Sequence, residues 1–192
     1  MLHNYLHGWA VAESLLNGNL LIGGDGSVKN GLGTHGYELR PVDGDSIRGA
    51  AQSLGTLQSM SSLRAEHLGE IAILLILCGT CTCYNITECP ATKIHIDNKE
   101  VVDQGSKLME KREKLQDYDL WAVSKSLRHS LPIEAKNTWV KAHQDDGDTP
   151  LAELPPAGAQ INIAVDALAG GLQNSIQGTG PLPVPHYGPE QI

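Results

Sequence analysis

The sequence feature that most constrains the fold is a glycine-rich stretch at residues 22–36, IGGDGSVKNGLGTHG. It lacks the glycine-lysine-serine or glycine-lysine-threonine ending of a phosphate-binding Walker loop. A calcium loop is excluded because Lys29 stands where an oxygen ligand is needed. A dinucleotide fingerprint would have to open a helix, whereas a strand pattern follows here. The stretch therefore predicts a hairpin with Asp25 near a strand end, although DGS alone is typical of an ordinary turn.

The apolar patterns of the remaining chain predict a mixed α/β domain. We expect strands at 19–27, 32–40, 45–54, 93–98 and 133–143, and helices at 61–77, from 99 onward, at 117–131 and at 159–172. The order βββ-α-β-α-α-β-α predicts a five-stranded mixed sheet flanked by helices. We divide the chain into an N-terminal leader, a domain and a proline-rich tail or linker, at 1–18, 19–172 and 173–192. The last helix is expected to end at its glycine pair.

The net charge and the apolar content of the chain exclude some classes of function. A formal net charge of -8 argues against a protein that coats nucleic acid through a basic surface. The same charge is compatible with an enzyme that reaches nucleic acid through metal ions. No run of about 18 apolar residues occurs, so no transmembrane helix is expected. The N-terminus lacks a secretory signal, and we therefore expect an intracellular protein, in the cytoplasm or nucleus, without membrane contact.

The four cysteines, at positions 78, 81, 83 and 89, fall in a segment that we expect to be a loop after a helix. Their spacing lacks the distant second ligand pair of a zinc ribbon. Reduced thiols at the end of a helix are therefore the favoured interpretation, and a zinc site stays the alternative.

Three further carboxylates lie at or within the predicted elements: Glu66 near a helix start, Asp97 at a strand end and Asp166 in the last helix. Glu66 would suit a helix N-terminus on electrostatic grounds alone, and Asp97 could cap the following helix. Asp166 lies among apolar residues, where an unpaired carboxylate is costly. A cation shared with Asp25 would compensate all four charges, and oxygen ligands favour magnesium or manganese.

The motifs DGS, RAE, IDN, DLW, WVKAH and N-x3-D-x-LA follow one another along the chain. In this order they resemble the type 1 ribonuclease H domain over residues 19–172. The resemblance implies the ribonuclease H-like fold and hydrolysis of the RNA strand of RNA/DNA hybrids with two magnesium ions, manganese being the alternative. The residues that it implies at the catalytic and metal positions are Asp25, Glu66, Asp97 and Asp166, with His143 as the mobile active-site histidine.

The resemblance also implies a nucleic-acid surface that reads the 2′-hydroxyl groups of the RNA strand. Its candidate contacts are the backbone at Gly26 and Ser27 and the side chains of Ser62, Asn98 and Asn162. The glycine-rich hairpin would let the nucleic-acid backbone approach closely. Trp121 of the DLW motif is implied as core packing. The acidic residues without a catalytic counterpart are interpreted as surface charges: Asp103, Asp117 and Asp119.

The serine-rich approach to RAE is similar to that of retroelement-type domains, which implies a reverse transcriptase domain in a larger polyprotein as a partner. Three features depart from the family pattern. One is the cysteine loop, which lengthens the path from Glu66 to Asp97. The loop after His143 is long and acidic, with Asp145, Asp146, Asp148 and Glu153. The basic handle is diluted, offering Lys107, Lys111, Arg112 and Lys114 around Met109 and Glu110. A weak or inactive structural module of a retroelement product therefore stays the alternative function. An integrase on the same fold fits less well, because the integrase glutamate comes from the last helix.

Overall fold

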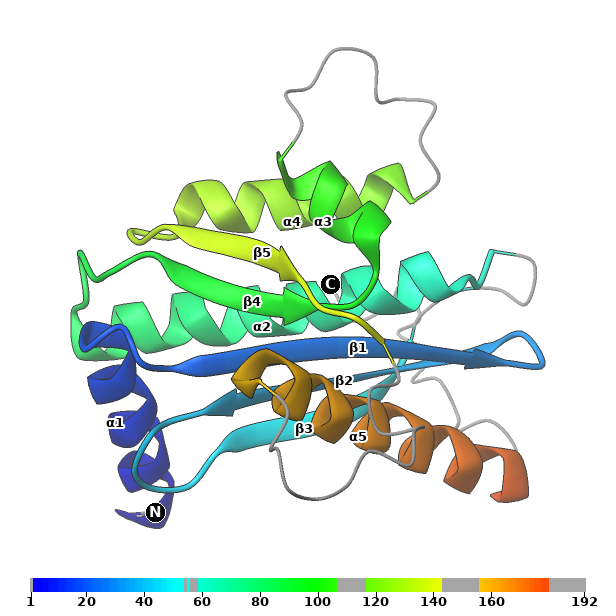
Figure 1. Cartoon of the computed structure of the whole chain (residues 1–192), viewed down its shortest axis with the longest axis horizontal. Helices are drawn as coiled ribbons and strands as arrows, with labels where there is room; N and C mark the ends of the chain where they lie inside the picture. Colours follow the sequence, from blue (N-terminus) through cyan, green and yellow to red (C-terminus); the bar gives the residue numbers. More distant parts are fainter. Residues whose placement is uncertain (1, 54, 56–58, 107–116, 143–155, 180–192) are drawn as a thin grey trace, which may run out of the picture.

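The computed structural model describes residues 2–53, 55, 59–106, 117–142 and 156–179 of the chain. Its elements in chain order are α1 (Leu2–Leu16), β1 (Leu21–Lys29), β2 (Leu32–Arg40), β3 (Ile47–Ser53), α2 (Ser62–Tyr84), β4 (Thr92–Ile96), α3 (Lys99–Ser106), α4 (Tyr118–Ser130), β5 (Ala135–Trp139) and α5 (Ala157–Thr179). The strands form one sheet, with α2 and α5 packed across its opposite faces (Figure 1).

The sheet has five strands in the order β3-β2-β1-β4-β5. The first three strands form an antiparallel meander, whereas β4 pairs parallel to β1 and β5 pairs parallel to β4. This arrangement confirms the predicted five-stranded mixed sheet flanked by helices. The structure adds one helix, α1, which precedes β1 in the chain. Ile22 lies opposite Ile94 in the parallel register of β1 and β4. Continuing that register toward the ends of the strands sets Asp25 beside Asp97.

The glycines of β1 and β2 bring the helices onto the sheet. A Cβ atom added to Gly26 would lie 2.4 Å from the backbone nitrogen of Glu66 in α2. On the opposite face, a Cβ added to Gly36 would lie 2.6 Å from the carbonyl oxygen of Val165 in α5. Both neighbours are backbone atoms, so any larger residue would push a helix away from the sheet. The glycines at these two positions thus serve helix packing, and the close approach of nucleic acid to the hairpin stays a prediction.

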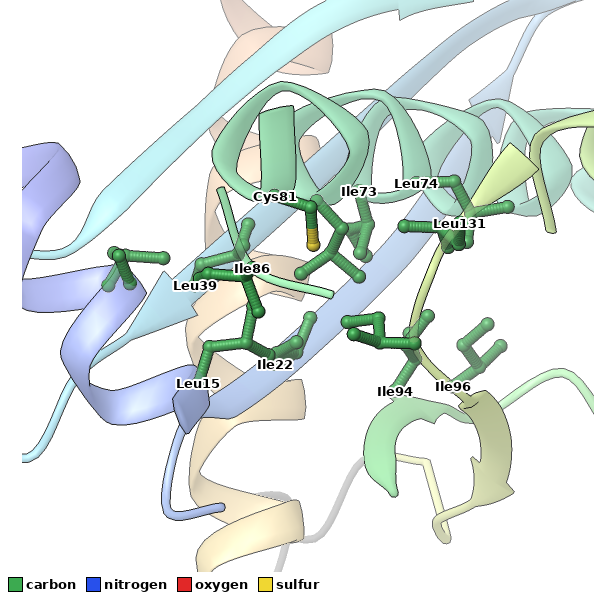
Figure 2. Close-up of a cluster of buried hydrophobic side chains, with 14 of the residues drawn as sticks. Leu15, Ile22, Leu39, Ile73, Leu74, Cys81, Ile86, Ile94, Ile96 and Leu131 are labelled. Carbon is green, nitrogen blue, oxygen red and sulfur yellow. The ribbon is translucent and has the colours of Figure 1, made fainter. Parts of the chain in front are cut away.

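The core is almost entirely aliphatic, and Figure 2 shows its side chains meeting from α1, α2 and the central strands. Ile22 and Ile94 are fully buried between the neighbouring strands β1 and β4. Val11 and Leu15 of α1 are equally buried and belong to the same cluster. The core therefore includes side chains from the segment assigned to a leader, while the division of the chain into three regions stays a prediction.

Two helices are longer than the sequence predicted. Helix α2 continues through most of the cysteine segment and ends only at Asn85, whose left-handed φ of 54° closes it. The predicted loop is therefore wrong up to Tyr84. Helix α5 runs through the glycine pair to Thr179, because neither Gly170 nor Gly171 adopts the left-handed conformation that ends a helix.

By length and composition alone, α2 is apolar enough to cross a membrane. The sequence did not predict this, because polar residues interrupt the apolar run. The core helices of soluble proteins pass the same test. Half of the most apolar 18-residue window of α2 is buried inside the fold, where Ile73, Leu74 and Leu77 belong to the core. Packing against the sheet therefore accounts for the apolar character of this helix.

The four cysteines are free thiols. Burial raises the pKa of Cys81 to about 11, with smaller contributions from Cys89 and Cys78. A zinc ligand has to be a thiolate, and a raised pKa disfavours that form. The favoured interpretation of reduced thiols near the end of a helix agrees with this environment.

Candidate metal centre

Three of the four predicted carboxylates meet at one point of the fold. Asp25, Glu66 and Asp97 each offer a carboxylate oxygen, and these oxygens lie within 4.8 Å of one another. They come from the middle of β1, the first turns of α2 and the residue that follows β4. Asp25 and Glu66 are buried, whereas Asp97 is partly exposed. The cluster is therefore open to solvent on the side of Asp97.

The start of α2 fixes the position of Glu66. The Ser61 hydroxyl is the N-cap and accepts a hydrogen bond of 3.0 Å from the backbone nitrogen of Arg64. One turn further along the helix, a Cβ at Gly69 would lie 3.4 Å from the carbonyl oxygen of Asp25. The cap and this close crossing together hold the first turns of α2 directly over Asp25.

Asp97 lies between β4 and α3 and does not cap that helix. The cap is Asn98, whose side-chain oxygen accepts hydrogen bonds of 3.0 Å from Glu100 and 3.4 Å from Val101. The alternative that Asp97 is a capping residue is therefore wrong. Its carboxylate faces Asp25 and Glu66 instead.

Asp166 reaches the cluster from α5, on the other face of the sheet. Its charge and its hydrogen bond both act on Asp25 and raise the pKa of that carboxyl group. Asn162 lies one turn earlier in α5 and is only 2% exposed. Its side-chain nitrogen is buried without a hydrogen-bond partner among the described residues. Burial does not favour the direct nucleic-acid contact predicted for Asn162.

The electrostatics of the cluster are those of a site built for a cation. Burial, followed by the charges of Asp97 and Asp166, raises the pKa of Asp25 to about 8. Burial also raises the pKa of Glu66 well above its ordinary value, with further contributions from Asp25 and Asp97, while a hydrogen bond from the Gly26 backbone opposes the change. Packing this many acids together is unfavourable without a positive partner.

An orphaned atom supports the same interpretation. Glu66 Oε2 is buried and has no hydrogen-bond donor among the described residues. Carboxylate oxygens are the ligands that magnesium and manganese prefer. The donor set and the unpaired oxygen therefore fit a hard divalent cation, held by Asp25, Glu66 and Asp97 with Asp166 beside them.

The predicted active-site histidine and the remaining predicted nucleic-acid contacts differ in where they lie and how exposed they are. His143 lies outside the described residues. The Gly26 backbone is hydrogen-bonded to the Glu66 carboxylate, and Ser27 is partly exposed further along β1. Ser62 is exposed at the first position of α2, and Asn98 is partly exposed at the cap of α3. The nucleic-acid contacts of all these residues stay predictions.

An arginine clamp between the start of α2 and the start of α4 was not predicted. Arg64 binds Asp117 and Asp119 at the start of α4, with nitrogen–oxygen distances of 2.9 Å to each. The Asp117 side chain is only 4% exposed, so its interpretation as a surface charge is wrong. Trp121 is buried, which confirms its predicted place in the core. The clamp joins segments more than 50 positions apart, and no local pattern marks such a pairing.

A buried carboxylate outside the cluster, Glu70, was also missed. Its Oε1 accepts hydrogen bonds of 2.5 Å from Arg128 and 2.7 Å from Asn137, and its Oε2 accepts one of 3.0 Å from Ser124. Burial would raise the pKa of Glu70, but hydrogen bonds from His67 and Arg128 lower it to about 2. Glu70 is thus a charged structural group that ties α2 to α4 and β5, one turn after Glu66.

A separate hollow of about 500 Å³ lies at the other ends of β1 and β4. It is lined by Arg40, Lys93 and His95 together with the start of α5 and the turn after α1, and none of the four carboxylates borders it. We place the functional site at the carboxylates, because only they combine convergent ligand atoms, perturbed pKa values and an orphaned buried oxygen.

Comparison with known proteins bears on the fold. No protein-family model matches the sequence, and no curated protein matches it. Among solved structures, the chain is similar to the RNase H1 of the halophilic archaeon Halobacterium salinarum NRC-1. The identity is 15% and the TM-score 0.55, over 81% of this chain and 98% of that one.

Two further solved structures of ribonuclease H domains are similar to the chain. The N-terminal RNase H domain of a Mycobacterium tuberculosis protein is 17% identical with a TM-score of 0.53, over 83% of this chain and 96% of that one. LC11-RNase H1 in complex with an RNA/DNA hybrid is 13% identical with a TM-score of 0.54, over 82% and 99%. At such low identity the likeness concerns the backbone alone. The chain therefore has the fold of the type 1 ribonuclease H domain.

Proposed function

We propose that the protein is a metal-dependent endonuclease that hydrolyses the RNA strand of RNA/DNA hybrids. The observation that carries the proposal is the convergence of Asp25, Glu66 and Asp97 within 4.8 Å, with Asp166 beside them, on a fold shared with type 1 ribonucleases H. One of the similar structures, LC11-RNase H1, is in complex with an RNA/DNA hybrid. Fold alone does not define activity, so the site carries the proposal.

Two magnesium ions, or manganese in their place, would supply an activated water and stabilise the leaving oxygen. Asp25, Glu66, Asp97 and Asp166 would hold the ions through their carboxylate oxygens. In the metal-free site the raised pKa of about 8 keeps a proton on Asp25 at neutral pH. Cation binding must displace that proton, so metal affinity should increase with pH.

The remaining parts of the proposal concern substrate and setting. His143 would assist proton transfer or product release, because an imidazole titrates near neutral pH. Gly26, Ser27, Ser62 and Asn98 would contact the hybrid, whose RNA strand is distinguished by its 2′-hydroxyl groups. We also infer an intracellular retroelement product joined to a reverse transcriptase. Sequencing the encoding locus tests this, since an isolated gene without reverse transcriptase motifs would contradict it.

Cleavage assays test the activity directly. A labelled RNA/DNA hybrid, an RNA duplex and a DNA duplex are incubated side by side with the protein and magnesium, and only the hybrid should be cut. Asp97→Asn preserves size and removes one ligand charge, so it should abolish cleavage. Asp43→Asn changes an exposed carboxylate in the turn after β2 and is the matched control.

The outcomes separate the two functions. An intact hybrid under all metal conditions, or equal cleavage by Asp97→Asn, would refute the nuclease. A wild-type protein that cuts nothing and whose melting temperature does not respond to magnesium would instead favour the alternative of a structural module.

A further inference from the structure

Trp139, the last residue of β5, contacts the backbone of a metal-site residue. Its indole Nε1 donates a hydrogen bond of 2.9 Å to the main-chain carbonyl oxygen of Asp97. The indole is nevertheless 51% exposed. A half-exposed tryptophan contributes little core packing, so the directed hydrogen bond is its most specific interaction.

The residue that follows β5, Val140, holds the preceding peptide. The backbone nitrogen of Val140 donates a hydrogen bond of 3.0 Å to the carbonyl oxygen of Ile96. Ile96 is the last residue of β4 and pairs with Trp139 in the parallel ladder. Consecutive residues at the end of β5 therefore bind consecutive carbonyl groups on either side of the Asp97 Cα atom.

Peptide groups are planar and rigid. Anchoring the Ile96 carbonyl fixes the plane before the Asp97 Cα, and anchoring the Asp97 carbonyl fixes the plane after it. The two soft dihedral angles of Asp97 lie between these planes, so the direction of its Cα–Cβ bond is set by β5. Only the side-chain torsions are left to bring the carboxylate to Asp25 and Glu66.

This support matters because Asp97 lies outside regular structure. Strand β4 ends at Ile96 and α3 begins at Lys99, so the ladder hydrogen bonds of β4 end one residue before Asp97. Asp25 and Glu66, in contrast, lie inside β1 and α2, where regular hydrogen bonds hold the backbone. The Trp139 indole extends the parallel ladder by one residue, with a side-chain donor in place of a backbone one.

We propose that Trp139 is a positioning residue for the metal centre, whose indole N–H fixes the backbone of Asp97 and thereby aims its carboxylate at the cation. The inference rests on the proposed function only in taking the carboxylates as metal ligands. Groups that orient a ligand from outside the coordination sphere typically change metal affinity by about 10- to 100-fold when removed.

The test uses Trp139→Phe, which keeps an aromatic ring and removes the N–H donor. Magnesium and manganese affinities are measured by titration calorimetry on the full chain. We expect binding about tenfold weaker. The melting temperature of the metal-free protein should fall by only about 2–4 °C, as for one lost hydrogen bond. Trp9→Phe is the matched control, because Trp9 is also about half exposed, at 56%, but lies in α1.

A spectroscopic measurement on the unmutated protein gives an independent readout. Terbium(III) seeks oxygen ligands and emits when a nearby excited indole transfers energy to it. Tryptophan excitation should therefore give terbium emission that magnesium displaces. The emission should persist in Trp9→Phe and fall strongly in Trp139→Phe, while calorimetry still detects terbium binding to both variants.

Two results would overturn the proposal. One is wild-type metal affinity in Trp139→Phe; the other is terbium that binds the wild-type protein without tryptophan-sensitised emission. Neither readout depends on cleavage. A protein that binds metal in this way but cuts no hybrid would refute the nuclease and leave the positioning role intact.

Discussion

Replacing the ionisable carboxyl group of Asp25 with an amide should stabilise the metal-free protein. Asp25 is only 4% exposed, and burial together with the charges of Asp97 and Asp166 raises its pKa from 3.8 to about 8. The folded state thus binds a proton that the unfolded chain releases at lower pH. Stability from this group is fully present below pH 3.8 and is lost as the pH rises toward 8, so the metal-free protein should weaken across that window.

The magnitude follows from the same pKa change. At pH 7 the unfolded carboxyl has passed its pKa by about 3 units, and each unit corresponds to about 1.4 kcal/mol, which gives an upper value of about 4 kcal/mol. The amide that replaces the carboxyl group in Asp25→Asn is neutral without taking up a proton, but it is still a polar group to bury. For this variant we therefore expect a gain of about 2–4 kcal/mol at pH 7, or roughly 4–16 °C in melting temperature.

The assay is urea unfolding in the presence of a chelator, at about pH 5 and about pH 7.5, inside the window that the pKa change defines. The advantage of Asp25→Asn over the wild type should be larger at the higher pH, because the wild type has lost stability there. Saturating magnesium should reverse the ranking, since only the wild type keeps its full ligand set. Asp43→Asn, on the surface, should match the wild type under every condition. The reasoning is refuted if Asp25→Asn is less stable than wild type without metal, or if its advantage does not change with pH.

Three further predictions concern the rest of the molecule. Gly26→Ala should lower the free energy of urea unfolding by about 3 kcal/mol, because the added Cβ meets the backbone of α2. Gly79→Ala should instead stabilise α2 by about 0.5–1 kcal/mol, because a Cβ added there has no atom within 4 Å. Equal effects of the two substitutions would contradict the packing argument. Glu70→Gln should cost about 3–5 kcal/mol at pH 7 by leaving Arg128 without its partner. Because the pKa of Glu70 is lowered from 4.5 to about 2, that difference should disappear as acid titration crosses this range, and a constant difference would argue against the ion pair. Magnesium should raise the melting temperature of the wild type with concentration and leave Asp25→Asn nearly unchanged; a parallel rise in both would place the cation elsewhere.

The strands and the carboxylate cluster could be predicted because their signals are local. The predicted strand 32–40 coincides with β2, since its alternating residues and flanking turn signals mark both ends. Glu66 and Asp97 each follow from a short motif at an element boundary. Asp25, which the sequence predicted near a strand end, lies instead in the middle of β1, because the strand continues to Lys29. The motifs together predicted a meeting point that no single one could.

What could not be predicted depends on contacts between distant segments. Helix α1 looked like a weak leader, because its apolar stripe is short and only the neighbouring strands reveal that Val11 and Leu15 are buried. Glu70 resembles a solvated helix residue in the sequence. It is charged in the core only because Arg128 and Asn137 arrive from α4 and β5. Pairings of this kind leave no pattern within the window of a helix or strand.

The glycines that seat α2 and α5 on β1 and β2 have a consequence for recognising such domains. Their small size is required by the architecture, so a descendant that had lost its metal ligands would still need them at Gly26 and Gly36. A glycine-rich first hairpin is therefore a marker of ancestry and shape, and says nothing about whether a domain still works. Sequence surveys that separate catalytically active domains from inactive ones should therefore score the acidic positions and ignore the glycines around them.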